Sequence, residues 1–209
     1  MNKWLGVCAC LLLSAVVQAQ QVTPLSDDEQ TLILRVADQV VLQEGDKPGD
    51  ARAVALDRAK QQGAQFSSRM LRALQQELPL EEGQWQLLNW AYLQVLESRD
   101  TPGVAMDGRA QLDLEVTFRQ PKAALIHAVT LLQADERHQQ RLTELAEEIG
   151  QLRHSLAQLQ QQQPTAEVQQ SSRDDEPDTV AAQREHLLQQ LERSRMELRR
   201  AFGRKANSA

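Results

Sequence analysis

The chain has 209 residues, a length that predicts one globular domain with an extended part rather than two full domains. Hydrophobic residues make up 41% of it but aromatic residues only 3%, which argues against a large core because aromatic side chains supply the biggest single burials. The formal net charge of -6 excludes attraction of the whole molecule to nucleic acid or to an anionic membrane.

Residues 1–19 are predicted to be a secretory signal peptide. Lys3 supplies the positive start, residues 5–17 form an apolar run, and Val17 and Ala19 give the small-residue spacing of a cleavage site. We therefore expect cleavage after Ala19 and an exported, periplasmic protein. A transmembrane anchor is the alternative, but this run is too short to span about 30 Å of hydrocarbon comfortably.

The chain's cysteines, Cys8 and Cys10, both lie inside this leader. Lipidation at either one would need a small-residue box at the end of the apolar run, whereas both lie in its middle. The mature chain is therefore expected to hold no thiol, no disulfide and no cysteine metal site. No other stretch of the sequence is long and apolar enough to cross a bilayer.

The next part of the chain predicts a polar leader, a strand, a loop and a helix. Residues 20–30 are polar and are interpreted as the leader, whereas residues 31–42 are apolar and β-branched, as in a strand. Glycines and a proline in residues 43–50 predict a loop. Residues 51–78 have small or apolar side chains every three to four positions, which indicates a helix. Because Gly63 costs a helix about 1 kcal/mol relative to alanine, we expect a close backbone approach there.

A short helix and a β-hairpin are expected to follow. Residues 109–118 alternate strictly between apolar and polar side chains, which is typical of a strand with one solvated face. Such a strand needs a neighbour, and residues 91–99 supply it across the turn-rich stretch 100–108. The pattern before this strand fits both a helix and a strand, and we interpret the residues from Trp85 to Asn89 as a short helix.

The C-terminal half is predicted to be helical. A helix begins near Pro121 and is expected to continue into a coiled-coil helix over residues 131–160. Residues 161–178 are rich in glutamine and aspartate and predict a disordered linker. A basic amphipathic helix is expected over residues 179–203. The fold class is therefore α+β: a small domain over residues 31–130 with a strand, an alanine-rich helix and a β-hairpin, followed by a coiled-coil and helical C-terminal region.

Six apolar residues of the coiled-coil helix recur at intervals of three and four and form one seam. The seam residues are Leu142, Leu145, Ile149, Leu152, Leu156 and Leu159. Assigned to heptad positions a and d, they favour a parallel two-stranded coiled coil in which Glu148 and Arg153 would form an interstrand ion pair. The seam covers fewer than three heptads, so two alternatives stay open. The C-terminal helix would fold back on it as an antiparallel hairpin, or the seam would pack on the globular domain.

Two stretches of the predicted domain carry a resemblance to a known family. They are GDARAVALDRAKQQGA (49–64), with its Ala-Arg-x-x-Ala-Leu-x-x-Ala core, and the strand RAQLDLEVTF (109–118). With the order of the elements, they resemble the small α+β domain of periplasmic flagellar ring-assembly proteins and related envelope lipoproteins. The resemblance covers roughly residues 31–125 and implies a ring-forming or assembly role rather than an enzyme. The chain departs from the family by lacking the usual lipidation cysteine and by adding the long helical region.

The residue patterns predict no catalytic, cofactor-binding or metal-binding site. The histidines of the chain are His127, His138, His154 and His186. All of them fall in predicted helices, and no two have the i,i+3 or i,i+4 spacing of a helical metal pair. The stretch GDKPGD (45–50) lacks the spacing of a phosphate-binding loop.

Two other groups of side chains have alternative interpretations. Trp85, Trp90 and Tyr92 are interpreted as a cap of the small core, or else as a surface cluster that recognises a glycan or a partner. Between residues 184 and 205, seven basic residues stand against three glutamates. This basic end suits a helix macrodipole, or else it docks to an acidic partner, lipid headgroups or a cell-wall polymer.

These features lead us to expect a non-enzymatic exported protein. It would be a structural or assembly protein that self-associates or docks to a cell-envelope complex through the coiled-coil region, with no nucleic acid and no cofactor. The alternative is a periplasmic glycan- or ligand-binding module that uses the aromatic cluster.

Overall fold

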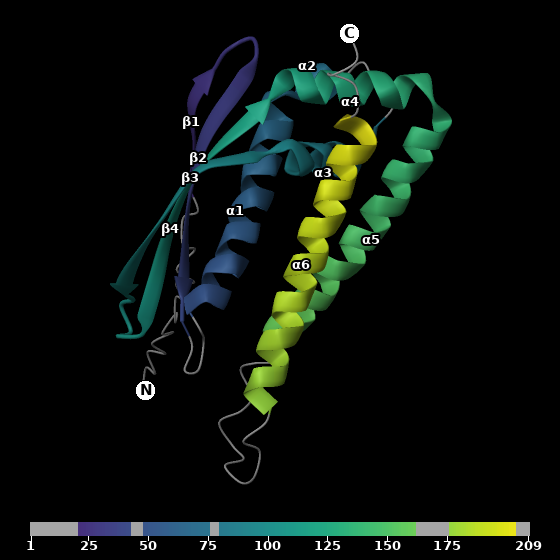
Figure 1. Ribbon diagram of the computed structural model, residues 1–209. Helices are drawn as coiled ribbons and strands as arrows, with labels where there is room; N and C mark the ends of the chain where they lie inside the picture. The colour runs from purple at the N-terminus through teal and green to yellow at the C-terminus, as the bar shows by residue number, and fades with distance from the viewer. Residues whose placement is uncertain (1–20, 43–47, 76–79, 162–175, 204–209) are drawn as a thin grey trace, which may run out of the picture.

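A computed structural model describes residues 21–42, 48–75, 80–161 and 176–203 (Figure 1). The predicted signal peptide and most of the predicted linker lie outside the described residues. The described part is built in three layers: an antiparallel sheet, a middle layer containing α1 and α3, and an outer layer formed by α5 and α6. An α+β fold is therefore confirmed.

The sheet has four antiparallel strands in the order β1-β2-β4-β3. β2 (Thr31–Val41) and β4 (Ala110–Pro121) are central, and β1 (Gln21–Asp27) and β3 (Gln94–Val104) form the edges. The alternation predicted for β4 is confirmed, and β2 has it as well. The buried apolar residues of these two strands are Leu32, Leu34, Val36, Leu112, Leu114, Val116 and Phe118. One face of the sheet is therefore covered by helices, and the other carries mostly polar side chains.

The prediction of a polar leader over residues 20–30 is wrong, because β1 pairs antiparallel with β2. Most of its side chains are exposed, so its composition does not distinguish it from a solvated tail. The Asp28 carboxylate holds the turn into β2, accepting the backbone N–H groups of Thr31 at 2.7 Å and Gln30 at 2.8 Å. These hydrogen bonds lower the pKa of Asp28 because they favour its charged form, and the bond from Thr31 has the larger effect.

Helix α1 (Pro48–Met70) covers the inner face of the sheet with small side chains. The predicted close approach at Gly63 is confirmed: a Cβ there would lie 2.9 Å from Leu93 Cδ2 and 3.3 Å from Leu34 Cδ1. The predicted loop over residues 43–50 is too long, because α1 already begins at Pro48, a residue that the first turn of a helix tolerates.

The predicted helix over residues 51–78 is too long at its C-terminal end. Helix α1 stops at Met70 and is followed by the short helix α2 (Arg72–Gln75), whereas residues 76–79 lie outside the described residues.

Helix α3 (Glu82–Tyr92) contains the short helix that was predicted, and the β3-β4 hairpin is also confirmed. The strand predicted over residues 91–99 is wrong at its start, because Ala91 and Tyr92 belong to α3. The helix begins with a capping box between Glu81 and Gln84, and its buried stripe extends through Tyr92. Alternation in residues 91–95 therefore coincides with a helical stripe, and the strand begins only at Gln94.

Helices α4 (Lys122–Ala134) and α5 (Glu136–Gln161) are separate, so the expectation of one continuous helix is wrong. Asp135 between them has an extended backbone (φ -150°, ψ 119°), and its Oδ1 accepts the N–H of Arg137 at 2.9 Å. The break therefore serves as the cap of α5.

Helix α6 (Glu176–Gly203) begins slightly earlier than predicted and packs beside α5. The two helices are antiparallel, because Arg141 near the start of α5 forms an ion pair with Glu197 near the end of α6. Figure 1 shows them as a hairpin on the far side of α1 from the sheet.

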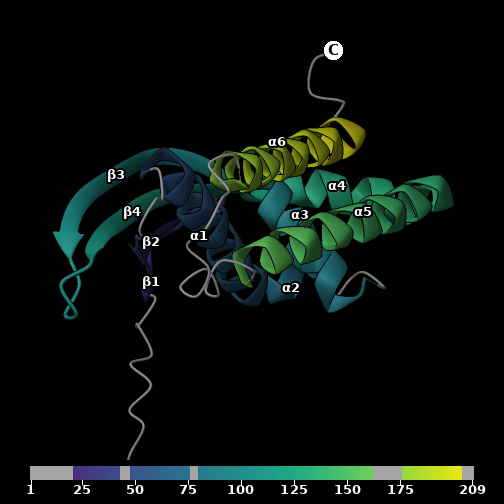
Figure 2. The ribbon, with the colours of Figure 1, turned by 90° about the horizontal axis from the view of Figure 1, so that it is seen from below.

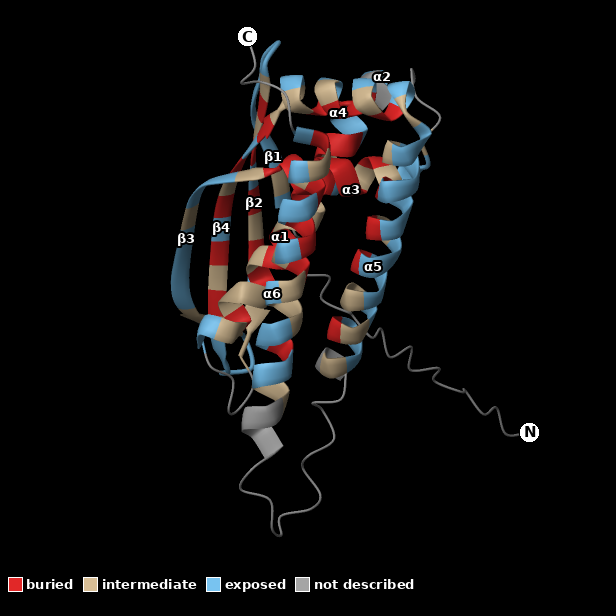
Figure 3. Ribbon diagram, turned by 45° about the vertical axis from the view of Figure 1, so that its right-hand side comes forward, coloured by how far each residue is buried: buried red, intermediate tan, exposed pale blue. Residues whose placement is uncertain are grey.

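A continuous cluster of buried apolar side chains runs from the sheet through α1, α3 and α4 to α5 and α6 (Figure 3). The predicted domain over residues 31–130 and the helical region after it therefore share one core. Helix α4 also crosses the expected boundary at residue 130.

Candidate functional site

The seam faces another helix of the same chain. Leu142, Leu145, Ile149 and Leu156 are buried, and Leu152 and Leu159 are half-buried. Their apolar cluster includes Leu191, Leu198 and Phe202 of α6. The face that the heptad pattern assigned to a second chain is thus occupied by α6, in the antiparallel arrangement that was the first alternative.

The predicted interstrand pair of Glu148 and Arg153 is wrong for this arrangement, because it presupposed two parallel helices. Glu148 instead accepts a hydrogen bond from Ser194 Oγ at 2.9 Å. The guanidinium of Arg153 lies over the ring of Trp90, 4.7 Å from its centroid. Burial lowers the pKa of Arg153, and the charge of Asp57 opposes this effect. Both side chains therefore connect elements within one chain.

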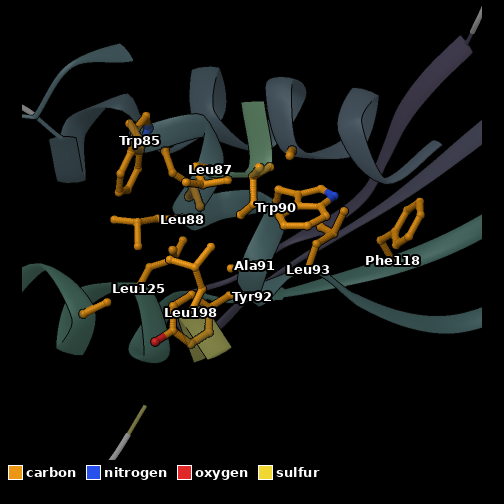
Figure 4. Close-up of a cluster of buried hydrophobic side chains, with 14 of the residues drawn as sticks. Trp85, Leu87, Leu88, Trp90, Ala91, Tyr92, Leu93, Phe118, Leu125 and Leu198 are labelled. Atoms are coloured by element: carbon orange, nitrogen blue, oxygen red, sulfur yellow. The ribbon is translucent and has the colours of Figure 1, made fainter. Parts of the chain in front are cut away.

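The aromatic residues of α3 lie in the core rather than on the surface (Figure 4). Trp85, Trp90 and Tyr92 are at most 4% exposed. Trp85 donates its indole N–H to the backbone oxygen of Ser68 at 3.0 Å, and burial raises the pKa of Tyr92 to about 12. The interpretation as a core cap is confirmed, and no face of these rings is available for stacking on a sugar.

Arg195 fastens α6 to the end of α3. It is 5% exposed, and its Nε donates to the backbone oxygen of Trp90 at 3.2 Å. A terminal nitrogen donates to the backbone oxygen of Leu93, and the other donates to Glu192 at 2.7 Å. Cationic groups are favourable at the C-terminal end of a helix, where carbonyl groups lack partners.

This contact continues to α1, because Glu192 also forms an ion pair with Lys60 at 2.9 Å. The hairpin is therefore held to the middle layer by directed polar contacts as well as by apolar packing.

The basic C-terminal helix is only partly a surface feature. Arg184 and Arg195 are buried, whereas Arg193 and Arg200 are exposed. Residues 204 and 205, which supply two of the seven basic side chains, lie outside the described residues. Arg184 and Arg195 therefore do not contribute to a basic surface patch, although both are counted in the charge excess along the sequence.

The α5-α6 hairpin has an open groove of about 560 Å³ at the end where α5 stops and α6 begins. We call this feature the groove. Its apolar lining residues are Leu159, Ala182 and Leu187, and its polar ones are Ser155, Gln158, Gln183 and His186. All of these belong to α5 or α6, so the groove lies between the two helices alone. The heptad pattern places Leu159 at the end of the seam, but nothing in that pattern predicts the groove.

Comparisons with protein-family models, with curated protein sequences and with solved structures found no match. Within the described ranges, no helix is long and apolar enough to cross a membrane. The same part of the chain holds no cluster of three or more His, Cys, Asp or Glu side chains able to bind a metal ion.

Proposed function

We propose that this protein is a non-enzymatic exported assembly protein that associates with a larger structure of the cell envelope through the free end of its α5-α6 hairpin. Export rests on the predicted signal peptide over residues 1–19. The observation that carries the proposal is the groove, an open apolar surface between two helices whose remaining seam is already filled.

The chemistry of the groove suits a protein partner. Its apolar lining consists of Leu159, Leu187 and the small side chain of Ala182, and amides, a hydroxyl and an imidazole make up the rest of the lining. Apolar grooves between helices bind amphipathic segments, whose apolar side chains enter the groove while polar groups remain at the rim.

The groove is also held in place before any partner arrives. Arg195 ties α6 to α3, and Lys60 of α1 pairs with Glu192 of α6. A surface that is already ordered loses less conformational entropy on binding, so more of the apolar contact appears as affinity.

A pair of matched variants tests the proposal. Ala182→Glu places a charge in the groove at an exposed position, and Ala157→Glu places the same charge at an exposed position of α5 that does not line it. We expect proximity labelling in the native host to lose its envelope neighbours for Ala182→Glu and to keep them for Ala157→Glu. If both variants keep the same neighbours, the groove is not the docking surface.

A further inference from the structure

The turn between β3 and β4 is short and is closed by backbone hydrogen bonds. Ala105 N donates to Arg109 O at 2.9 Å and Gly108 N donates to Ala105 O at 2.9 Å, while Gly108 has a φ of 83°. This is the three-residue turn that ends with a residue in the left-handed region, which favours glycine. The carboxylate of Asp107 accepts the backbone N–H of Arg109 at 3.1 Å and its Nε at 2.7 Å. Met106 therefore sits on a braced turn.

This turn displays the most exposed large apolar side chains in the described part of the chain. Met106 is fully exposed and Val104 is 74% exposed, more than any other large hydrophobic residue there. We call residues 104–109 the tip. Methionine side chains adapt to irregular apolar surfaces and are common at binding sites. A braced turn that presents two such side chains to water has the form of an anchor for an apolar groove.

The strand behind the tip is less suited to binding. The N–H of Ala105 points toward β4. Because backbone N–H groups alternate between the two sides of a strand, position 102 faces away from β4, and its proline offers no hydrogen-bond donor there. A register shift between Val95 and Glu97 further interrupts this edge. Association through this part of the molecule therefore concentrates on the tip and not on strand addition to β3.

The tip and the groove lie at the same end of the molecule. In Figure 1 the β3-β4 turn and the free end of α5 and α6 both point to the lower side, and in Figure 2, seen from below, they lie on opposite sides of α1. The chain thus carries an apolar projection and an apolar groove on one end. A two-fold axis through this end would exchange them between two copies.

We propose that the tip of one copy binds in the groove of a second copy, and that the second tip binds reciprocally in the first groove. This inference rests on the proposed function and deepens it: the segment that the groove binds within the larger envelope structure is the tip of a second copy of the chain, so that structure contains this chain as a dimer. Met106 and Val104 would contact Leu159, Ala182 and Leu187.

The charges of the two surfaces are compatible with this contact. Within the tip, Asp107 and Arg109 pair with each other at 2.6 Å and neutralise one another. The groove is lined by no Asp, Glu, Lys or Arg side chain. Burial of the tip in the groove therefore leaves no charge without a partner. An unpaired buried charge would oppose association.

Sedimentation velocity over a range of concentrations tests the proposal on the exported protein. Because burial of a methionine or valine side chain is favourable, Met106→Asp should raise the dimer dissociation constant by about tenfold or more. Ala182→Glu should do the same. Met70→Asp, which alters another exposed methionine outside both surfaces, should leave the constant unchanged.

Mixing the variants distinguishes the reciprocal contact from other dimers. A Met106→Asp copy keeps its groove and an Ala182→Glu copy keeps its tip, so an equal mixture retains one intact contact and should associate more tightly than either variant alone. A tip-to-tip or groove-to-groove dimer would gain nothing from mixing in this way. That outcome, or a monomer at every concentration, would refute the proposal.

A photo-cross-linking residue at position 106 gives an independent result. We expect a covalent dimer whose cross-linked peptide contains residues 155–159 or 182–187, and cross-links elsewhere would contradict the contact.

Suppose instead that the chain is monomeric, that Ala182→Glu loses the envelope neighbours and that Met106→Asp keeps them. The proposed function then stands and the reciprocal dimer falls. If neither variant changes association or neighbours, both proposals fail.

Discussion

Replacing Arg195 by methionine would test whether directed contacts fasten α6 to the rest of the fold. Methionine keeps an unbranched side chain in this buried position but removes the hydrogen bonds to the backbone oxygens of Trp90 and Leu93 and to Glu192. The carboxylate of Glu192 keeps its ion pair with Lys60. The main loss is therefore at the end of α3, where two carbonyl groups lose a charged donor.

The expected cost follows from these contacts. A hydrogen bond from a charged donor contributes about 1.5–3 kcal/mol, and removal of the guanidinium also relieves part of the cost of burying its charge. We therefore expect Arg195→Met to lower the free energy of unfolding by about 3 kcal/mol. Arg195→Lys should have an intermediate effect, because one ammonium group lacks the planar fork that reaches several acceptors.

Equilibrium urea unfolding, followed by tryptophan fluorescence, measures the change. The unfolding midpoint should fall by about 1 M or more for Arg195→Met. Arg193→Met alters an exposed neighbour on the same helix and should change the free energy by no more than about 0.5 kcal/mol. If the two variants unfold alike, the Arg195 contacts do not fasten α6, and apolar packing together with the remaining polar contacts holds the hairpin.

Three further predictions concern the core. Gly63→Ala should lower the free energy of unfolding by about 1–3 kcal/mol, because the alanine Cβ would meet Leu93, although alanine has the better helix propensity. Gly150→Ala should instead raise thermal stability, because the space around Gly150 is open. Tyr92 is the chain's only tyrosine, so an absorbance titration should show ionisation near pH 12. Because the unfolded tyrosine loses its proton near pH 10, stability should fall from there toward pH 12, and Tyr92→Phe should remove this slope. Leu145→Ala should cost about 2–5 kcal/mol in chemical denaturation and Leu159→Ala clearly less, because only Leu145 is fully buried; equal losses would contradict this gradient.

The sequence predicted those elements whose apolar pattern has only one structural solution. Strict alternation identified β4, since a strand is the element in which every second side chain enters the core. It missed β1, whose residues are mostly exposed on both sides and gain their structure from pairing with β2. The start of β3 was misplaced because Ala91 and Leu93 also belong to a buried stripe at the end of α3.

The candidate site was only partly predictable, because a seam shows that a helix has a partner but not which chain supplies it. The apolar pattern of α6 is interrupted by Ser194 and Arg195, which in the sequence looks like a weak packing face. In the structure these polar residues point at specific acceptors, Glu148 and the end of α3, so they belong to the interface. Long-range partners of this kind leave no local signal in either helix.

The closed seam also limits how two copies of the chain can meet. A parallel coiled coil through α5 would require α6 to leave, which would expose Leu198 and Phe202 and break the contacts of Arg195. The new interface would first have to offset these losses, and a seam of fewer than three heptads offers little beyond the apolar contacts that α6 already makes. Association without such opening has to use surfaces that the fold leaves accessible, and the groove and the tip are apolar surfaces of this kind at one end of the molecule.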